Sequence, residues 1–200
     1  ALRSAGRRVA LIPTAGALHA GHASLIRLAR ETGAAVVVST FVNPLQFGPS
    51  EDLAKYPRTP SSDVLFAEKE SVDVLFVPSV EEMYPRGFST HLQEEVISKH
   101  LCGIARPALF RGMLTCWLKL FNIVRPDTVV MGERDAQQIA VVRKATADLL
   151  LPIEILTGPT VRDVDGLVVS ARNSYLTPTQ REEAQAVHAA LRRAKEMVEA

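Results

Sequence analysis

Short apolar runs alternate with longer amphipathic segments, and this alternation limits the fold of the 200-residue chain more than any other feature. The run at 35–41 (AVVVSTF) is the clearest strand, because β-branched residues favour extended backbone. Strands separated by helices pair in parallel, so we predict an α/β fold: a Rossmann-like parallel sheet with helices on both faces. Strands are expected at 9–12, 35–41, 72–77, 128–131 and 153–156, and helices at 22–31, 61–70, 112–124 and 135–150. The strand at 72–77 is expected to be buried, and Ser61-Ser62-Asp63 is expected to cap the helix at 61–70.

The composition changes near Gly158-Pro159, where we place the end of the first domain. Residues 161–173 form a polar, hairpin-like stretch with Asp165-Gly166 as its expected turn. Thr177-Pro178 then opens a helix that runs to the end of the sequence without a stop signal. We therefore predict a domain at 1–159 and the beginning of a smaller C-terminal α+β lid domain at 160–200, which is expected to be cut short.

The overall charge and composition indicate an ordinary globular protein. The net charge is +1, with 47% hydrophobic and 22% charged residues, so bulk attraction to nucleic acid or membrane is not expected. No uninterrupted apolar stretch is long enough to span a bilayer. Cys102 and Cys116 do not form a C-x-x-C pair, which favours a reducing cytoplasm over a disulfide scaffold.

Two histidines follow the first predicted strand, in the segment PTAGALHAGH. His19 and His22 lie at the carboxyl end of a strand and at a helix N-terminus, where doubly wound sheets bind anionic ligands. Small residues such as Gly21 let the backbone approach a phosphate, to which both rings can donate hydrogen bonds or positive charge. A pair of structural histidines is the plainer alternative. Zinc is a weaker one, because no third ligand is suitably spaced.

Polar side chains also follow other predicted strands. Asn43 and Gln46, in FVNPLQF, offer amides that can bind carboxylates or hydroxyls. The alternative is a proline-directed turn whose amides are solvated, which would have the same sequence pattern. In GERDAQQ, Asp135 can cap a helix and Arg134 can reach a phosphate, although a capped helix with a surface ion pair is common. Ser170 and Arg172, two apart on an extended segment, point the same way and could clamp a polyphosphate, a weak signal in isolation.

The H-x-G-H pattern resembles the signature of the nucleotidyltransferase superfamily, and the segments together resemble the pantothenate synthetase family over nearly the whole chain. That family joins pantoate to β-alanine with ATP and Mg²⁺ through a pantoyl adenylate, releasing AMP and pyrophosphate. The blocks that carry the resemblance are PTAGALHAGH, FVNPLQFGPSEDLAKYPRT, VPSVEEMYP, LCGIARP, FRG, LKLFNIVRPD, GERDAQQ and VVSARNSYL.

The resemblance implies roles for individual residues, a homodimer and a cytoplasmic enzyme; the sequence does not identify Mg²⁺ ligands. Catalytic phosphate contacts are implied for His19, His22, Arg134, Ser170 and Arg172. Further nucleotide contacts are implied for Pro13, Gly21, Gly132, Asp135 and Val161. Substrate contacts are implied for Gln46 and Gln138 with pantoate, for Asn43 in the β-alanine region, and for Ala15 and Trp117 in the acid pocket.

The chain departs from the family pattern around that acid pocket. Ala15 replaces Met, Leu109 replaces His, and Cys116 and Trp117 replace small aliphatic residues, while Arg134 replaces Lys. These changes imply a reshaped pocket, although Trp117 could simply pack in the core. Three alternatives stay open: a paralogous ligase or adenylating enzyme for another carboxylic acid, a nucleotidyltransferase that stops after the first step, and a non-catalytic nucleotide-binding module.

Overall fold

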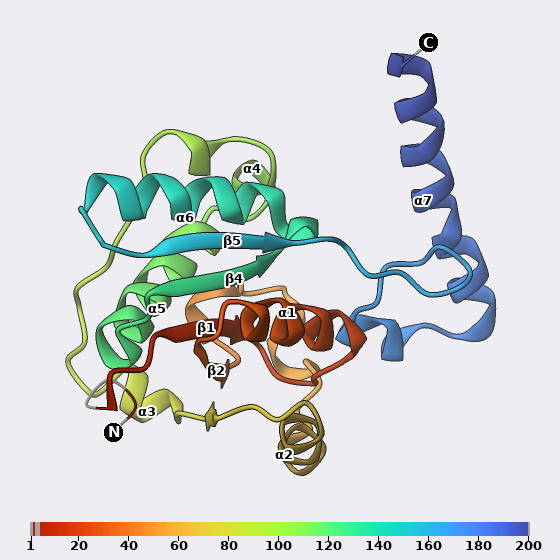
Figure 1. Cartoon of the computed structure of the whole chain (residues 1–200). Coiled ribbons are helices and arrows are strands. Elements are labelled where there is room, and N and C mark those ends of the chain that lie inside the picture. The colour runs from red at the N-terminus through yellow and green to blue at the C-terminus, as the bar shows by residue number, and fades with distance from the viewer. Residues whose placement is uncertain (1, 3–4, 200) are drawn as a thin grey trace.

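The fold is built on five parallel strands in the order β3-β2-β1-β4-β5 (Figure 1). It is seen in a computed structural model that describes residues 2 and 5–199. The sequence prediction of a parallel sheet is confirmed. The strands are β1 (Val9–Thr14), β2 (Ala35–Thr40), β3 (Val74–Phe76), β4 (Thr128–Gly132) and β5 (Glu154–Gly158).

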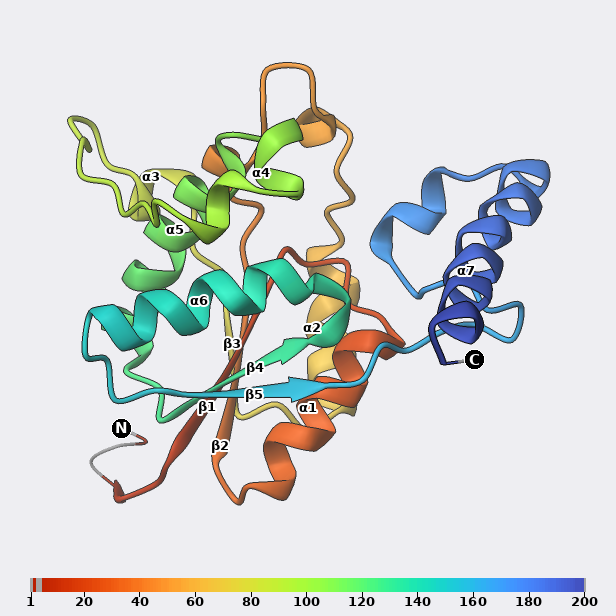
Figure 2. The ribbon, with the colours of Figure 1, turned by 90° about the horizontal axis from the view of Figure 1, so that it is seen from above.

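Helices cover both faces of the sheet because successive strand residues point to opposite sides. Leu11 and Val129 face α5 (Leu109–Val124) and α6 (Ala136–Asp148) in one core cluster. Ala10, Ile12 and Val130 face α1 (Ala20–Glu31) in the other, against which Phe66 of α2 (Pro60–Lys69) also packs. Figure 2 shows α5 and α6 on one side of the sheet and α1 on the other. The sheet is therefore held between two apolar layers. Two short helices, α3 (Val80–Met83) and α4 (Cys102–Ala105), lie in the connection between β3 and α5.

Three local predictions were wrong. Helix α2 begins at Pro60 after Thr59, so Ser61, Ser62 and Asp63 do not cap it. Helix α5 begins at Leu109 instead of Gly112. Strand β3 is a short edge strand with Val74 41% exposed, whereas the apolar run had indicated a buried one.

The segment after β5 forms a small unit to one side of the sheet (Figure 1). Arg162 and Val168 form an antiparallel bridge, and Gly166 supplies the left-handed turn (φ +84°) of the expected hairpin. Residues Ala171–Tyr175 form a 3-10 helix. Ser170, the residue before it, is extended as expected (φ −153°, ψ 144°), but Arg172 is helical, so the prediction of one extended segment that carries both residues was wrong. Helix α7 (Pro178–Glu199) follows, standing away from the sheet with no buried residue. The predicted end of this helix at Ala200 lies outside the described residues.

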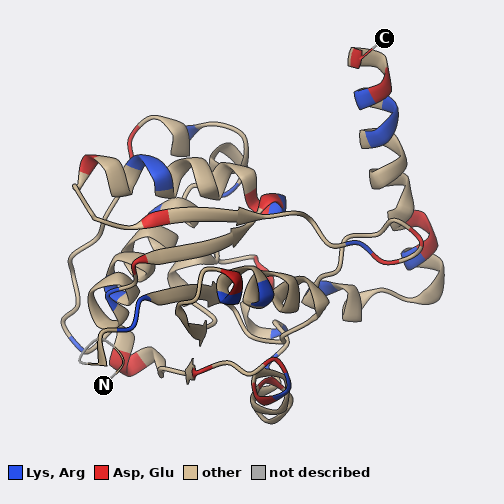
Figure 3. Cartoon of the chain, viewed as in Figure 1, with Lys and Arg blue, Asp and Glu red and all other residues tan. Residues whose placement is uncertain are grey.

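Charged residues of both signs are interspersed over the outer helices (Figure 3). Within residues 2 and 5–199, no helix is both long and apolar enough to cross a membrane.

Candidate active site

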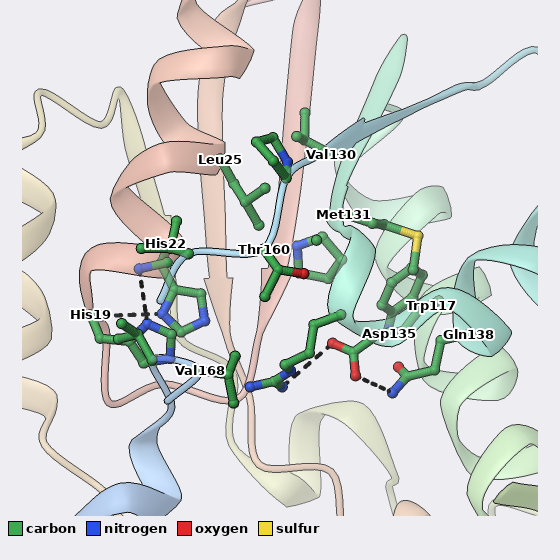
Figure 4. Close-up of a pocket in the computed structure, with 17 residues that line it drawn as sticks. His19, His22, Leu25, Trp117, Val130, Met131, Asp135, Gln138, Thr160 and Val168 are labelled. Carbon is green, nitrogen blue, oxygen red and sulfur yellow. Dashed lines mark hydrogen bonds and ion pairs between the residues drawn. The ribbon is translucent and has the colours of Figure 1, made fainter. Parts of the chain in front are cut away.

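Two adjoining cavities open at the carboxyl ends of β1 and β4, the neighbouring strands at the centre of the sheet. The chain leaves β1 toward β2 and leaves β4 toward β5, so its connections diverge here, as at the ligand sites of other doubly wound sheets. The smaller cavity is lined by residues including Gly21, Leu25, Met131, Gly132, Thr160, Val161 and Val168 (Figure 4). The larger is lined by residues including Ala15, Asn43, Gln46, Tyr56, Arg106, Ser170 and Arg172. Both are lined by Pro13, His19, His22, Trp117, Arg134, Asp135 and Gln138.

His19 and His22 stand at this junction and together cap the N-terminus of α1. The Nδ1 atom of His19 accepts a hydrogen bond from Gly21 N, and that of His22 accepts one from His19 N, both at 3.2 Å. Their rings stack with centroids 4.0 Å apart. Since each Nδ1 is an acceptor, each neutral ring carries its proton on Nε2, where it can donate to a ligand.

Both histidines are neutral at ordinary pH. Burial, together with His19 and Arg134 nearby, lowers the pKa of His22 to about 3. Burial and Arg134 also lower the pKa of His19. The expectation that these rings could offer positive charge is therefore corrected: they are hydrogen-bond donors, and the cation beside them is Arg134.

The buried state of His22 predicts a pH-dependent loss of stability. Its pKa is about 3 in the folded protein and about 6.5 in an unfolded chain. Between these pH values the unfolded state binds a proton at His22 that the folded state does not. The free energy of unfolding is therefore unaffected by His22 titration above pH 6.5, and it falls as the pH is lowered toward 3. We expect His22→Gln to lose less stability than the parent between about pH 7 and pH 5 in urea unfolding. Equal losses would contradict this origin.

A buried carboxylate from α2 fixes the turn that precedes the histidines. Gly16 (φ +78°) and Ala17 (φ +49°) both have left-handed backbone. Asp63 accepts hydrogen bonds from Ala17 N at 3.1 Å and Leu18 N at 2.8 Å, and one from the Thr59 hydroxyl. Asp63 was missed as a site residue, because at the sequence level it was interpreted as a helix cap.

The segment after β4 places Arg134, Asp135 and Gln138 at the junction. Asp135 occupies the N-cap position of α6, but its carboxylate makes no capping hydrogen bond, which corrects the sequence prediction. Its oxygens instead accept from Gln138 Nε2 at 3.1 Å and pair with Arg134 Nη2 at 3.5 Å (Figure 4). The carboxylate thus orients both neighbours toward the cavities.

The turn after β2 is locked to α5. Asn43 is 2% exposed, and its side chain donates to Gly112 O and accepts from Leu45 N and the Tyr84 hydroxyl. Its amide is largely engaged within the protein, while Gln46 lines the larger cavity.

The close approach of α5 to this turn requires a glycine at position 112. A Cβ atom there would lie 2.0 Å from Leu45 O. Gly112→Ala is therefore expected to cost about 1–3 kcal/mol in urea unfolding and to shift the turn that carries Gln46. Gly33→Ala is a control for alanine substitution, since a Cβ there would meet no atom within 4 Å; its left-handed backbone still carries some strain.

The four pocket departures gather on the larger cavity, which Ala15, Leu109, Cys116 and Trp117 all line. Burial raises the pKa of the Cys116 thiol to about 12, so it stays protonated. Trp117 is 9% exposed and packs edge-on against Phe121, with ring centroids 6.2 Å apart. The indole is therefore a core residue and a cavity wall at once.

Every residue expected to form the site lines one or both cavities. Sequence reasoning missed Tyr56 and Arg106, which also line the larger cavity, although both lie in blocks that carried the resemblance.

The sequence of the chain is similar to those of one family of proteins. A family model described as pantoate-beta-alanine ligase matches residues 1–200. The pantothenate synthetase of Heliobacterium modesticaldum is 52% identical over 194 residues, which are 97% of this chain and 69% of that protein. The pantothenate synthetase of Moorella thermoacetica is 49% identical over 200 residues, covering 100% and 71%.

Solved structures of the same family have a similar fold. The pantothenate synthetase of Thermus thermophilus superposes with a TM-score of 0.92 at 45% identity, covering 95% of this chain and 70% of that one. The pantoate-beta-alanine ligase of Francisella tularensis, complexed with beta-gamma ATP and beta-alanine, superposes with a TM-score of 0.89 at 38% identity, covering 94% and 72%.

Proposed function

Because the chain belongs to the pantoate–β-alanine ligase family, we propose that its two cavities condense pantoate with β-alanine at the expense of ATP. The smaller cavity takes the nucleoside, with Pro13, Gly21, Gly132, Asp135 and Val161 around it. The larger takes the acid beside Gln46 and Gln138. The ATP phosphates lie between them.

In the first step a pantoate carboxylate oxygen attacks the α-phosphorus of ATP. The bond from that phosphorus to the bridging oxygen breaks, and pyrophosphate leaves with the electron pair. Negative charge grows on the α-phosphate oxygens, where the Nε2–H groups of His19 and His22 and the Arg134 guanidinium stabilise it. Ser170 and Arg172 bind the outer phosphates from the second domain.

In the second step the neutral amine of β-alanine attacks the acyl carbon of pantoyl adenylate. The bond from that carbon to the AMP oxygen breaks, AMP leaves, and the amine loses a proton. No covalent enzyme intermediate is needed, since the protein acts by positioning and electrostatics. Contact of β-alanine with the Asn43 region stays a prediction.

Mg²⁺ is proposed to enter with ATP and offset phosphate charge. Within the described residues, no three His, Cys, Asp or Glu side chains are grouped as a metal site. Arginines dominate the charged groups of the larger cavity, so phosphate oxygens and water are the expected ligands.

The observation that carries the proposal is the pair of neutral histidines at the junction of the two cavities. Hydrogen-bond donors shared by both cavities suit a reaction at the point where two ligands meet. The test is release of AMP from ATP and Mg²⁺ when pantoate and β-alanine are supplied, with pantothenate as the second product. Absence of both products, with no AMP from other acids, would reject the proposal.

Another carboxylic acid is a second candidate substrate, because all four pocket departures line the larger cavity. A panel of acids, each assayed for acid-dependent AMP release, separates the two. Pyrophosphate exchange that needs no amine would instead indicate an enzyme that stops after the first step.

A homodimer and a cytoplasmic location complete the proposal. Two free thiols, Cys102 and Cys116, suit a reducing compartment that also supplies ATP. Light scattering of the purified protein tests the dimer.

A further inference from the structure

Two consecutive carboxylates, those of Glu51 and Asp52, each accept two hydrogen bonds from a different arginine of the larger cavity. Glu51 Oε1 accepts from Arg106 Nε at 2.9 Å, and its Oε2 accepts from Arg106 Nη2. Asp52 Oδ2 accepts from Arg172 Nε at 2.9 Å, and its Oδ1 accepts from Arg172 Nη2 at 3.1 Å. Arg106 follows α4, whereas Arg172 lies in the second domain, so one short loop orients cations from distant parts of the chain.

Each carboxylate holds its arginine by the same edge, through Nε and Nη2. Such forked pairs fix the plane of the guanidinium as well as its place. No hydrogen bond among the described residues uses Nη1 of Arg106 or Arg172, so that group is left for a ligand in the cavity the two arginines line.

Further contacts restrict where each arginine can go. Arg106 Nη2 also donates to Gln46 O at 3.2 Å, which ties this cation to the residue expected to hold the acid. Arg172 lies over the Tyr56 ring, 4.9 Å from its centroid, and the Tyr175 hydroxyl lies 3.2 Å from Asp52 Oδ2. Hydrogen bonds from Arg106 and from Arg172 lower the pKa of Glu51 and of Asp52 respectively, so both carboxylates are ionised when the enzyme works.

We propose that Glu51 and Asp52 are positioning residues. Asp52 holds the Arg172 guanidinium in the orientation that binds the phosphates of ATP, and Glu51 holds the Arg106 guanidinium in the orientation that binds the carboxylate of the acid. The assignment rests on the proposed function. A carboxylate that approaches a polyphosphate is repelled, and a cation already fixed beside Gln46 offsets that repulsion without reorganising.

A purely structural role makes a different prediction. Arg106 and Arg172 keep 35% and 44% of their side-chain surface exposed, and half-exposed ion pairs contribute little to stability. If these pairs only fastened the loop, their loss would change unfolding slightly and would affect all ligands alike.

The experiment compares Asp52→Asn, Glu51→Gln and the control Glu70→Gln in the full chain. Glu70 holds Arg27 with the same forked geometry, at 3.1 and 2.8 Å, and lines neither cavity. Asp52→Asn should raise the Kd for ATP, measured by calorimetry, roughly tenfold, as loss of a group that orients a ligand contact does elsewhere. Glu51→Gln should raise the KM for pantoate roughly tenfold and leave the Kd for ATP within about twofold. Glu70→Gln should change neither.

A double-mutant cycle completes the test. Asp52→Asn should add nothing to the loss of ATP affinity in Arg172→Ala, because a positioning residue has no effect once its arginine is gone. Independent, multiplying effects would overturn the proposal, as would equal changes in all three single variants. If the parent binds ATP yet releases no AMP with any acid, the proposed function fails while the ATP-binding comparison at Asp52 still stands.

Discussion

Replacement of His22 by alanine is expected to slow acid-dependent AMP release by about 10²–10³-fold, the usual cost of removing one donor to a charged transition state. The ring is held neutral by burial, with its pKa lowered to about 3, and its Nδ1 is occupied by His19 N. Its Nε2–H is therefore a fixed donor at the junction of the cavities. Because the donated bond strengthens only as charge grows on the α-phosphate, kcat and kcat/KM should fall together.

His22→Gln is the matched variant for this prediction. Its amide oxygen can accept from His19 N while its amide nitrogen donates toward the phosphate, so part of the rate should return. Single-turnover measurement of pantoyl adenylate formation separates this step from amide formation. An alanine variant that forms the adenylate at the parental rate would show that His22 only caps α1.

The sheet could be predicted because its strands carry local signals. The β-branched run in β2 and the apolar runs of β1 and β4 indicate strands whatever they pack against. The edge strand β3 was predicted too long and too buried, because an apolar run does not reveal that one side of its sheet is open. The start of α2 was misplaced because Pro60 at the first helical position made Thr59, not a serine, the cap residue.

The candidate site could be predicted only where it lies in continuous loops at strand ends. His19, His22, Gln46 and Asp135 belong to such loops. The contacts that orient them cross long stretches of sequence: Asp63 is 45 residues from Leu18, and Asp52 is 120 residues from Arg172. The protonation state of His22 depends on burial and on Arg134, neither of which a local pattern contains.

Replacement of Asp63 by alanine is expected to destabilise the protein by about 3 kcal/mol or more and to lower AMP release at least tenfold. The carboxylate is 5% exposed and accepts from Ala17 N and Leu18 N, so its loss leaves two backbone donors unpaired near the core, each costing about 1–3 kcal/mol. The left-handed backbone at Gly16 and Ala17 depends on those bonds. When that turn relaxes, His19 loses its place, because it directly follows Leu18. Urea unfolding measures the first effect, and AMP release well below the unfolding midpoint measures the second.

Asp73→Ala separates the two effects. Asp73 also accepts a hydrogen bond from a backbone N–H, that of Val36 at 2.8 Å, and pairs with Arg7, but it lines neither cavity. Asp73→Ala should lower the free energy of unfolding, while the folded variant should release AMP at the parental rate. If Asp63 acts on the histidines through the turn, and not through general weakening of the fold, Asp63→Ala must lose far more activity than Asp73→Ala at equal fraction folded. Equal activities would mean that the histidines keep their geometry without the carboxylate, and that the helix N-terminus and their stacked rings are sufficient to hold them.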